Sequence, residues 1–348
     1  AGTCSMGLPK PVNGTPCTPD PAVDLPIYTT WMSASVHELI TVRGFTNVEF
    51  LVAFTEPLDY HSGVVPPGHT QLSFYFETVR ALHQRLVEDG RRHLIRIQGP
   101  NSALFGEWTR LARKELGSIG AVDVYSGHLY NVPTYGMYHY LYSHAIDPIR
   151  DTTSPFIVDE AGSSDAAFRT TPAYGTYLGM LHTAAINAGA SGVTTWLYRD
   201  QYYVWPQSYL DMFGQEPWLP TQLDVRPSWY VLTMLTRYIG PPLTVSVLTS
   251  GEVDGVAVAA LKDNGDGSTC NRGILMVNTH KTSQRTTELV LDGWDCDRAL
   301  TRFAYDPAHP PSDNLPIPAN GTVRPSGSGY VLQDVVPPGG VVVWTTDP

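Results

Sequence analysis

Charged side chains are scarce in this chain of 348 residues, and Asp, Glu, Lys and Arg together make up only 16% of it. Basic residues number 22 against 33 acidic ones, which gives a formal net charge of −11. Without a basic stripe to offset phosphates, the sequence argues against nucleic acid or an anionic membrane as a partner. Apolar runs are also short, and none approaches the roughly 20 residues that cross a bilayer.

Several catalytic and metal-binding motifs are missing too. The eleven histidines include no HExxH pattern and show no convincing ligand spacing, so we expect no metal site. Ser163-Ser164 lacks the GxSxG turn of serine hydrolases. Asp263-Asn-Gly-Asp-Gly267 starts like a calcium loop but lacks the later Glu, so it predicts a hairpin turn instead. We also expect no cofactor.

Cysteine is rare, with four in the chain. Cys4 and Cys17 would close one short loop, and Cys270 and Cys296 another, so two disulfides and an oxidising compartment are the simplest interpretation. Asn13 and Asn320 each begin an Asn-Gly-Thr sequon, which is compatible with a secreted glycoprotein. No signal peptide is visible, but the first residues, AGTCSMG, look like a processed terminus.

What the sequence does contain is an alternation of short apolar runs and helical patterns. This alternation predicts βαβ units and a parallel sheet. The predicted strands are 47–54, 93–98, 121–125, 155–159 and 192–196, and the clearest helices are 27–43, 70–89, 177–188 and 228–238. Unusual polar residues follow each strand, where a (β/α)8 TIM-type barrel carries its active site.

Beyond the stop signal Ile239-Gly-Pro-Pro242 the pattern changes to short β-runs separated by Gly, Pro, Asn and Asp turns. This predicts an antiparallel β-sandwich of roughly seven or eight strands. We expect a disulfide-bonded lead-in over residues 1–25, a catalytic barrel portion over 26–242 and an accessory sandwich over 243–348. Bracing the barrel and binding polysaccharide are both open as roles for the sandwich.

Two glutamates terminate predicted strands that lie three strands apart. Glu56 and Glu160 would project from one barrel rim and face each other across its mouth. Glycoside hydrolysis needs such a pair, one carboxylic acid that protonates the leaving oxygen and one carboxylate opposite it. The pair predicts a glycosidase whose substrate is an oligo- or polysaccharide.

The residues around this pair resemble those of clan A glycoside hydrolases, and most closely family 39, the β-xylosidases and α-L-iduronidases. The resemblance rests on these motifs in this order: Phe54-Thr-Glu-Pro57, Gly99-Pro-Asn-Ser-Ala103, His128-Leu-Tyr130, Ile157-Val-Asp-Glu-Ala-Gly162 and Gly192-Val-Thr-Thr-Trp196. It implies a retaining double displacement with Glu56 as acid/base and Glu160 as nucleophile. The trailing β-sandwich fits the same group.

The resemblance also implies a set of substrate contacts. His128 and Tyr130 occupy positions that orient the nucleophile or touch the sugar, although His128 could equally be a satisfied rim histidine. Trp196 would form a hydrophobic floor for a sugar ring or belong to the core. Asn101 would be a sugar contact or a turn former, and Asp200 would line the rim of the subsite.

Two features depart from the family pattern. Relatives carry Asn immediately before the acid/base, whereas this chain has Thr55, which we expect to bind the sugar with a shorter donor. Barrel strands one to three are also not evident before Glu56. Because open sheet edges are exposed to unwanted pairing, we hypothesise that a second polypeptide or precursor fragment completes the barrel.

Two alternatives remain open from sequence. The chain could be a catalytically silent carbohydrate-binding barrel, which the change at Thr55 and the missing strands would explain. It could also be an inverting hydrolase, which requires a wider separation of the carboxyl groups. The sequence names neither the sugar nor the linkage, and it is compatible with exo- or endo-action.

Overall fold

The computed structural model describes residues 21–55, 57, 65–102, 106–195, 213–215, 223–239, 243–245, 251–263, 270–294 and 296–346. The chain divides into two compact units. Unit 1 comprises Ala1–Leu129 and Ser143–Asp159, and unit 2 comprises Tyr130–Tyr142 and Glu160–Pro348. No described helix is long and apolar enough to span a membrane.

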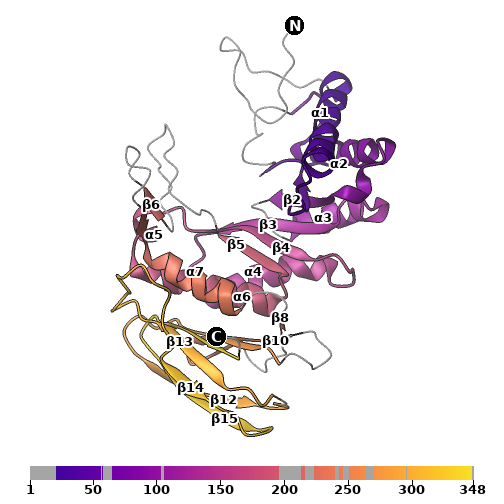
Figure 1. Cartoon of the computed structure of the whole chain (residues 1–348). Coiled ribbons are helices and arrows are strands. Elements are labelled where there is room, and N and C mark those ends of the chain that lie inside the picture. The colour runs from indigo at the N-terminus through magenta and orange to yellow at the C-terminus, as the bar shows by residue number, and fades with distance from the viewer. Residues whose placement is uncertain are drawn as a thin grey trace. The chain divides into compact units, whose positions relative to one another are not determined.

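Unit 1 combines helices with the first strands of a parallel sheet (Figure 1). Its elements in chain order are α1 (Pro21–Val36), a π-helix (His37–Val42), β1 (Phe50–Val52), α2 (Gln71–Glu88), a 3-10 helix (Arg92–Leu94), β2 (Arg96–Ser102), α3 (Glu107–Leu116), a 3-10 helix (Gly117–Ile119) and β3 (Val124–Tyr130). After α4 (Tyr135–Ile146) follow a 3-10 helix (Asp147–Ile149) and β4 (Phe156–Gly162). The unit boundary passes through β3, α4 and β4.

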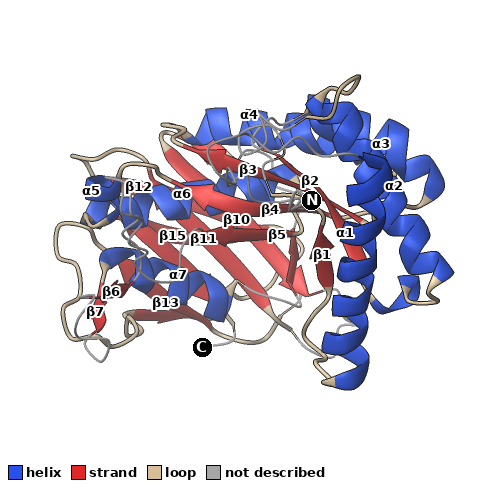
Figure 2. Ribbon diagram, turned by 90° about the horizontal axis from the view of Figure 1, so that it is seen from above, coloured by secondary structure: helices blue, strands red, loops and turns tan. Residues whose placement is uncertain are grey.

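The helix α2 shows how local chemistry sets an element. Thr70 caps it in a capping box with Ser73, since each side chain accepts from the other residue's backbone N–H. The predicted apolar stripe, including Phe74, Leu82 and Leu86, is buried. Helix α2 packs against α1 and α3, and α3 packs on β2, which places these helices at the same side of the sheet (Figure 2).

The first sheet has the strand order β1-β2-β3-β4-β5, where β5 is Gly192–Thr195. Its pairs β1–β2 and β2–β3 are parallel, with Val52 opposite Gln98 and Gln98 opposite Val124. Consecutive strands are neighbours in this sheet, which is a curled half-barrel. The predicted parallel sheet is confirmed.

Unit 2 contains β5 together with mostly antiparallel strands (Figure 1). Its remaining elements are α5 (Ala166–Arg169), α6 (Pro172–Ala188), β6 (Phe213–Gln215), β7 (Leu223–Val225), α7 (Pro227–Tyr238), β8 (Leu243–Val245), β9 (Glu252–Val253), β10 (Val256–Asp263), β11 (Arg272–Asn278), β12 (Arg285–Leu291), β13 (Leu300–Tyr305), β14 (Gly321–Val323), β15 (Tyr330–Val336) and β16 (Val341–Thr345). A seven-stranded sheet has the order β14-β13-β16-β11-β10-β8, with β9 beside β10, and β12 pairs with β15.

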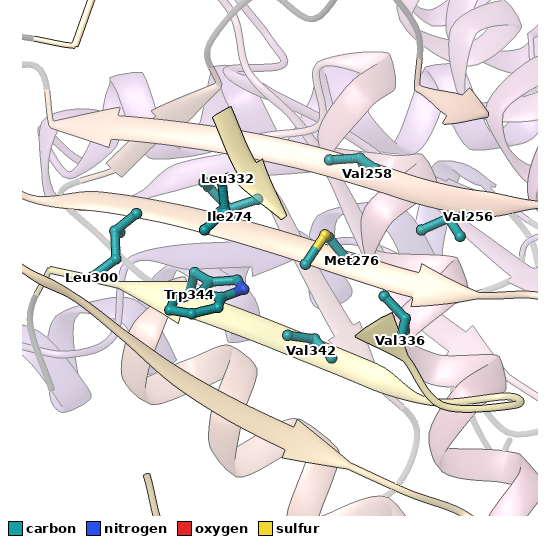
Figure 3. Packing of buried hydrophobic residues seen from close by; sticks show 9 residues of the cluster. All are labelled: Val256, Val258, Ile274, Met276, Leu300, Leu332, Val336, Val342 and Trp344. Carbon is teal, nitrogen blue, oxygen red and sulfur yellow. The ribbon is translucent and has the colours of Figure 1, made fainter. Parts of the chain in front are cut away.

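These antiparallel sheets share one hydrophobic core (Figure 3). Its buried members are Val256, Val258, Ile274, Met276, Leu300, Leu332, Val336, Val342 and Trp344. Leu289 and Leu291 of β12 pack against it. Exposed and less exposed residues alternate along β12 and β15, because every second side chain of a strand points to the core. The predicted β-runs beyond residue 242 are strands where the structure describes them, whereas the run 245–248 lies outside the described residues after Val245.

The helices α6 and α7 lie side by side, and α6 packs on β10 and β11 (Figure 2). Close approach is possible because α6 presents small residues. A Cβ atom added at Gly179 would lie 2.8 Å from Val341 Cγ2, and one at Gly175 would lie 2.9 Å from Tyr305 Cε1. The disulfide Cys270–Cys296 is present, with its Cα atoms 5.8 Å apart.

Several element boundaries differ from the prediction. β3 continues to Tyr130 and β4 to Gly162, so the polar residues expected after these strands are part of the strands themselves. The helical prediction over 27–43 corresponds to α1 followed by a π-helix. The domain boundaries after residues 25 and 242 stay predictions.

Candidate active site

Tyr130 and Glu160 meet at the ends of β3 and β4. The hydroxyl of Tyr130 donates a hydrogen bond of 2.8 Å to Glu160 Oε2. Both residues are partly buried. A carboxylate oxygen that accepts from a hydroxyl is held in one orientation. This contact brings together two residues that the sequence assigned to the site.

The backbone just beyond Glu160 is held by two further contacts. The backbone N–H of Asn131 donates to the Gly162 carbonyl at 3.2 Å, and the Tyr177 hydroxyl donates to the same oxygen at 2.7 Å. The amide of Asn131 also exchanges hydrogen bonds with Ser164, whose N–H lies 2.8 Å from Asn131 Oδ1. The chain on the carboxyl side of Glu160 is therefore fixed from α6 and from the residue after Tyr130.

Buried aromatic residues support this region from α4 and α6. The Tyr138 hydroxyl hydrogen-bonds to that of Tyr177, and Tyr174 stacks on Tyr177 with ring centroids 5.7 Å apart. Burial raises the pKa of Tyr177 above its usual value. Its hydroxyl therefore keeps its proton and remains a donor to Gly162 at neutral and moderately alkaline pH.

A second polar cluster lies in unit 1 around Asp159. Asp159 Oδ2 accepts from Gln98 Nε2 at 2.6 Å and from Asn101 Nδ2. His128 Nε2 lies 3.5 Å from Asp159 Oδ1. The side chain of His128 is 0% exposed and that of Asp159 11% exposed. Three neighbouring strands thus supply one network, with Gln98 from β2, His128 from β3 and Asp159 from β4.

This network assigns contacts to two residues that the sequence left open. The Asn101 side chain is buried and donates to Asp159, and its backbone adopts φ of 56° after the cis Gly99–Pro100 bond. Left-handed backbone is a conformation that Asn tolerates better than most residues, as a turn former would require. His128 is buried beside a carboxylate rather than free on a rim. Sugar contact by either residue stays a prediction.

The other expected site residues are less defined. Thr55 is exposed after β1. Glu56, Trp196 and Asp200 lie outside the described residues, as do Cys4 and Cys17. The acid/base, the hydrophobic floor, the subsite rim and the first disulfide therefore stay predictions.

Sequence reasoning missed three residues of this region, namely Gln98, Asp159 and Tyr177. A signal existed for two of them. Gln98 is a polar residue at the end of the run Leu94-Ile-Arg-Ile-Gln98, and Asp159 ends the apolar run before Glu160. Buried polar side chains are usually hydrogen-bonded, so the two could have been expected to find partners on neighbouring strands. Tyr177 carried no such signal, since it belongs to an apolar helix.

In the part of the chain that the structure describes, no group of three or more His, Cys, Asp or Glu side chains could hold a metal ion.

Comparison by sequence gives no relatives. No protein-family model matches the chain, and no curated protein matches it.

Comparison by structure matches many solved proteins. SrfJ from Salmonella typhimurium matches 92% of this chain with a TM-score of 0.62 and 15% identity. CelM2, a bifunctional glucanase-xylanase from a metagenome library, matches 96% with a TM-score of 0.63 and 14% identity. A family 39 β-xylosidase from Caulobacter crescentus matches 93% with a TM-score of 0.56 and 16% identity.

The chain spans 62% of the length of SrfJ and 72% of each of the other two structures. At these identities the matches concern the fold. The resemblance to glycoside hydrolases, family 39 among them, is confirmed at that level.

Proposed function

We propose that this chain is a retaining glycoside hydrolase in which Glu160 is the nucleophile and Glu56 the acid/base. The observation that carries the proposal is the hydrogen bond from Tyr130 to Glu160 Oε2. A nucleophilic carboxylate must present one oxygen in a fixed direction to the anomeric carbon, and a donor on the other oxygen supplies that orientation.

The Tyr130 hydroxyl also suits the charge changes of a double displacement. Glu160 is anionic before attack, becomes a neutral ester in the glycosyl-enzyme intermediate and is anionic again after hydrolysis. A phenol that donates to its carboxylate stabilises the charged form more than the ester. Tyr130 would therefore orient the nucleophile and assist its departure in the second step.

The Asp159 network supports the same region from unit 1. Buried hydrogen bonds from Gln98 and Asn101 stabilise its carboxylate and keep the strand that continues into Glu160 in one register. Fixed strands position reacting groups better than loops do. This network explains why a polar residue immediately before Glu160 is compatible with a buried strand.

The fold supports an O-glycosidase that acts on oligo- or polysaccharides. The curled half-barrel corresponds to part of a (β/α)8 barrel, and the core shared by the antiparallel sheets supports a β-sandwich accessory domain. The hypothesis that a second polypeptide completes the barrel gains no support from the comparisons. The disulfide Cys270–Cys296 is compatible with a secreted glycoprotein.

The test is hydrolysis of a panel of aryl glycosides by the intact chain and two variants. Glu160→Ala is expected to lose at least about 10³-fold in rate. Glu56→Ala is expected to lose activity that azide partly restores on substrates with activated leaving groups, because azide attacks the glycosyl-enzyme without needing a general base. Glu107→Gln, an exposed change on α3, serves as the control and should keep full activity.

Two outcomes would contradict the proposal. Unchanged hydrolysis in Glu160→Ala would remove Glu160 as nucleophile. Binding of sugars without turnover on any substrate would favour the catalytically silent barrel. The anomer formed first, followed by NMR, separates retention from inversion.

A further inference from the structure

A polar cavity lies in unit 2, between the hairpin β9–β10 and the segment that leads from β11 into β12. Its volume is about 620 Å³, within the range of small-molecule sites. Its lining residues are Asp254, Gly255, His280, Gln284, Arg285 and Thr286. None of them belongs to the proposed catalytic region, so any ligand here would occupy a second site.

One wall of the cavity is a tight hairpin turn. Val253 pairs with Val256, and the two residues between them, Asp254 and Gly255, adopt φ of 50° and 75°. Positive φ at both central residues is the geometry for which Asp-Gly is favoured. The His280 ring sits directly on this turn, because a Cβ atom added at Gly255 would lie only 2.2 Å from His280 Nε2. Any side chain at position 255 would occupy the space that the imidazole fills.

The backbone of His280 is equally well anchored. Its N–H donates to Asn278 Oδ1 at 2.9 Å, and its carbonyl accepts from the Gly339 N–H at 2.8 Å. The hydroxyl of Thr279 donates to the Gly255 carbonyl at 2.8 Å, which ties this segment to the hairpin. The imidazole is therefore presented from a preorganised backbone.

Arg285 supplies the positive charge of the cavity. Its Nη2 lies 3.0 Å from His280 Nε2. A guanidinium has only donors, so His280 Nε2 accepts in this contact and the ring carries its proton on Nδ1. Arg285 Nε is buried and has no hydrogen-bond partner among the described residues, and Arg285 forms no ion pair within that part of the chain.

The two Nη groups of a guanidinium can together bind a carboxylate with two parallel hydrogen bonds. In Arg285 only one of their N–H donors is used among the described residues, toward His280, while the buried Nε stays outside this contact. The remaining polar groups suit sugar hydroxyls. The carboxylate of Asp254 accepts hydrogen bonds, and the Thr286 hydroxyl and the Gln284 amide can each donate and accept them. The carboxylate of Asp254 also disfavours a dianion such as phosphate. An aromatic platform for a neutral sugar is absent among the six described lining residues, apart from the imidazole.

We propose that this cavity binds a carboxylate-bearing sugar, a uronic acid unit of a saccharide, with its carboxylate on Arg285 and its hydroxyls on Asp254 and Gln284. The antiparallel strands of unit 2 would then bind an acidic saccharide whether or not the catalytic site hydrolyses it.

The test uses the full chain and two probes that differ only at C6. Methyl β-D-glucuronide carries a carboxylate there, and methyl β-D-glucoside a hydroxymethyl group. Titration followed by saturation-transfer NMR at pH 7 is expected to show glucuronide binding at least about tenfold tighter than glucoside binding, because only the former pairs with a guanidinium. Acetate and inorganic phosphate, added as competitors, are expected to displace the glucuronide only at about tenfold higher concentration or more.

Three variants localise the site. Arg285→Gln should weaken glucuronide binding about tenfold or more, and Arg285→Lys, which keeps the charge and the aliphatic stem but loses the planar fork, should weaken it by about threefold or more. Lys281→Ala removes an exposed cation nearby that does not line the cavity and should change nothing. Thermal unfolding confirms that each variant is folded, and if Arg285→Gln is not, Arg285→Lys decides.

The proposal is overturned by equal binding of the two methyl glycosides, by unchanged binding in Arg285→Lys, or by an equal loss in Lys281→Ala. Displacement by acetate at the concentration of the glucuronide overturns it too, because the site would then recognise a bare anion. Arg285→Gln should hydrolyse aryl glycosides as the parent chain does, so failure of the catalytic assignment is measured separately.

Discussion

The phenol of Tyr130 donates to the carboxylate of Glu160 across 2.8 Å, from the end of one strand to the neighbouring strand. The two residues are separated by 30 positions in the chain, and α4 lies between them. Their meeting is a consequence of strand adjacency, because the ends of β3 and β4 reach the same edge of the sheet. The pair contains the proposed nucleophile and the group that donates to it.

Removing this donor is the most direct probe of the pair. Tyr130→Phe is expected to lower kcat by about 10- to 100-fold, with a smaller change in KM, because the hydroxyl acts on the charge that Glu160 gains and loses. Steady-state kinetics on an aryl glycoside would measure both constants.

Tyr140→Phe is the matched control, since that ring is 57% exposed on α4. An unchanged kcat in Tyr130→Phe, or an equal loss in the control, would show that the hydrogen bond has no part in catalysis.

The sequence was sufficient to predict the strands of the parallel sheet, and the structure places Glu160 and Tyr130 at the ends of two of them. Glu160 and Tyr130 each follow apolar β-runs, and such runs predict parallel strands whose carboxyl ends gather functional groups. Resemblance to a known family added the roles. The boundaries were less accurate, because the apolar run of β3 ends at Tyr125 although its hydrogen bonding continues to Tyr130.

The network around Asp159 could not be predicted in the same way. It requires that Gln98, His128 and Asp159 lie at matching heights on three strands, which depends on register. The sequence also did not predict where helix α4 begins and ends. Its first six residues, Tyr135 to Tyr140, contain three tyrosines and a histidine and show no clear apolar stripe. Local sequence patterns carry no information on contacts between residues that lie so far apart in the chain.

Packing of α6 on the antiparallel sheet depends on Gly179. A Cβ atom there would lie 2.8 Å from Val341 Cγ2 and 3.2 Å from Val277 Cγ2. We expect Gly179→Ala to reduce the free energy of unfolding by about 1–3 kcal/mol through overpacking, measured by urea denaturation.

Gly136→Ala in α4 is the control, since a Cβ atom at Gly136 meets nothing within 4 Å. It is expected to stabilise by about 0.5 kcal/mol through the better helix propensity of alanine. Equal effects of both changes would mean that α6 does not need close approach to β16.

The antiparallel sheets are joined by a buried charged group. Arg302 Nε lies 3.0 Å from both oxygens of Asp334, and Trp344 Nε1 donates to Asp334 Oδ2 at 2.6 Å. Asp334 is 9% exposed, so its loss leaves the partly buried guanidinium of Arg302 without its counter-charge. Asp334→Asn is expected to lower the free energy of unfolding by about 3 kcal/mol.

Glu288→Gln is the control for this change. Glu288 lies on β12, the strand that pairs with β15. It is exposed and accepts one hydrogen bond from Gln333. Its replacement should have no measurable effect. If Asp334→Asn were equally silent, the buried pair would contribute nothing to the core.

His182 on α6 provides a prediction for pH. Desolvation lowers its pKa from 6.5 to about 4, and its Nε2 lies 3.3 Å from the Thr195 hydroxyl. The folded state therefore holds the ring neutral while the unfolded chain takes up a proton at pH 6.5. Stability from this group is complete above pH 6.5 and is lost as the pH falls to 4, because the unfolded state then binds more protons.

His182→Gln removes this linkage and keeps a polar side chain near Thr195. Between pH 7 and pH 4, the parent chain is expected to lose more free energy of unfolding than the variant, by at most about 3 kcal/mol. Urea denaturation of both proteins at pH 7, 5.5 and 4 measures the difference, and comparison of the two chains cancels the contributions of other groups. Identical losses would show that the ring is protonated as easily in the folded state as in the unfolded one, which its desolvation beside β5 argues against.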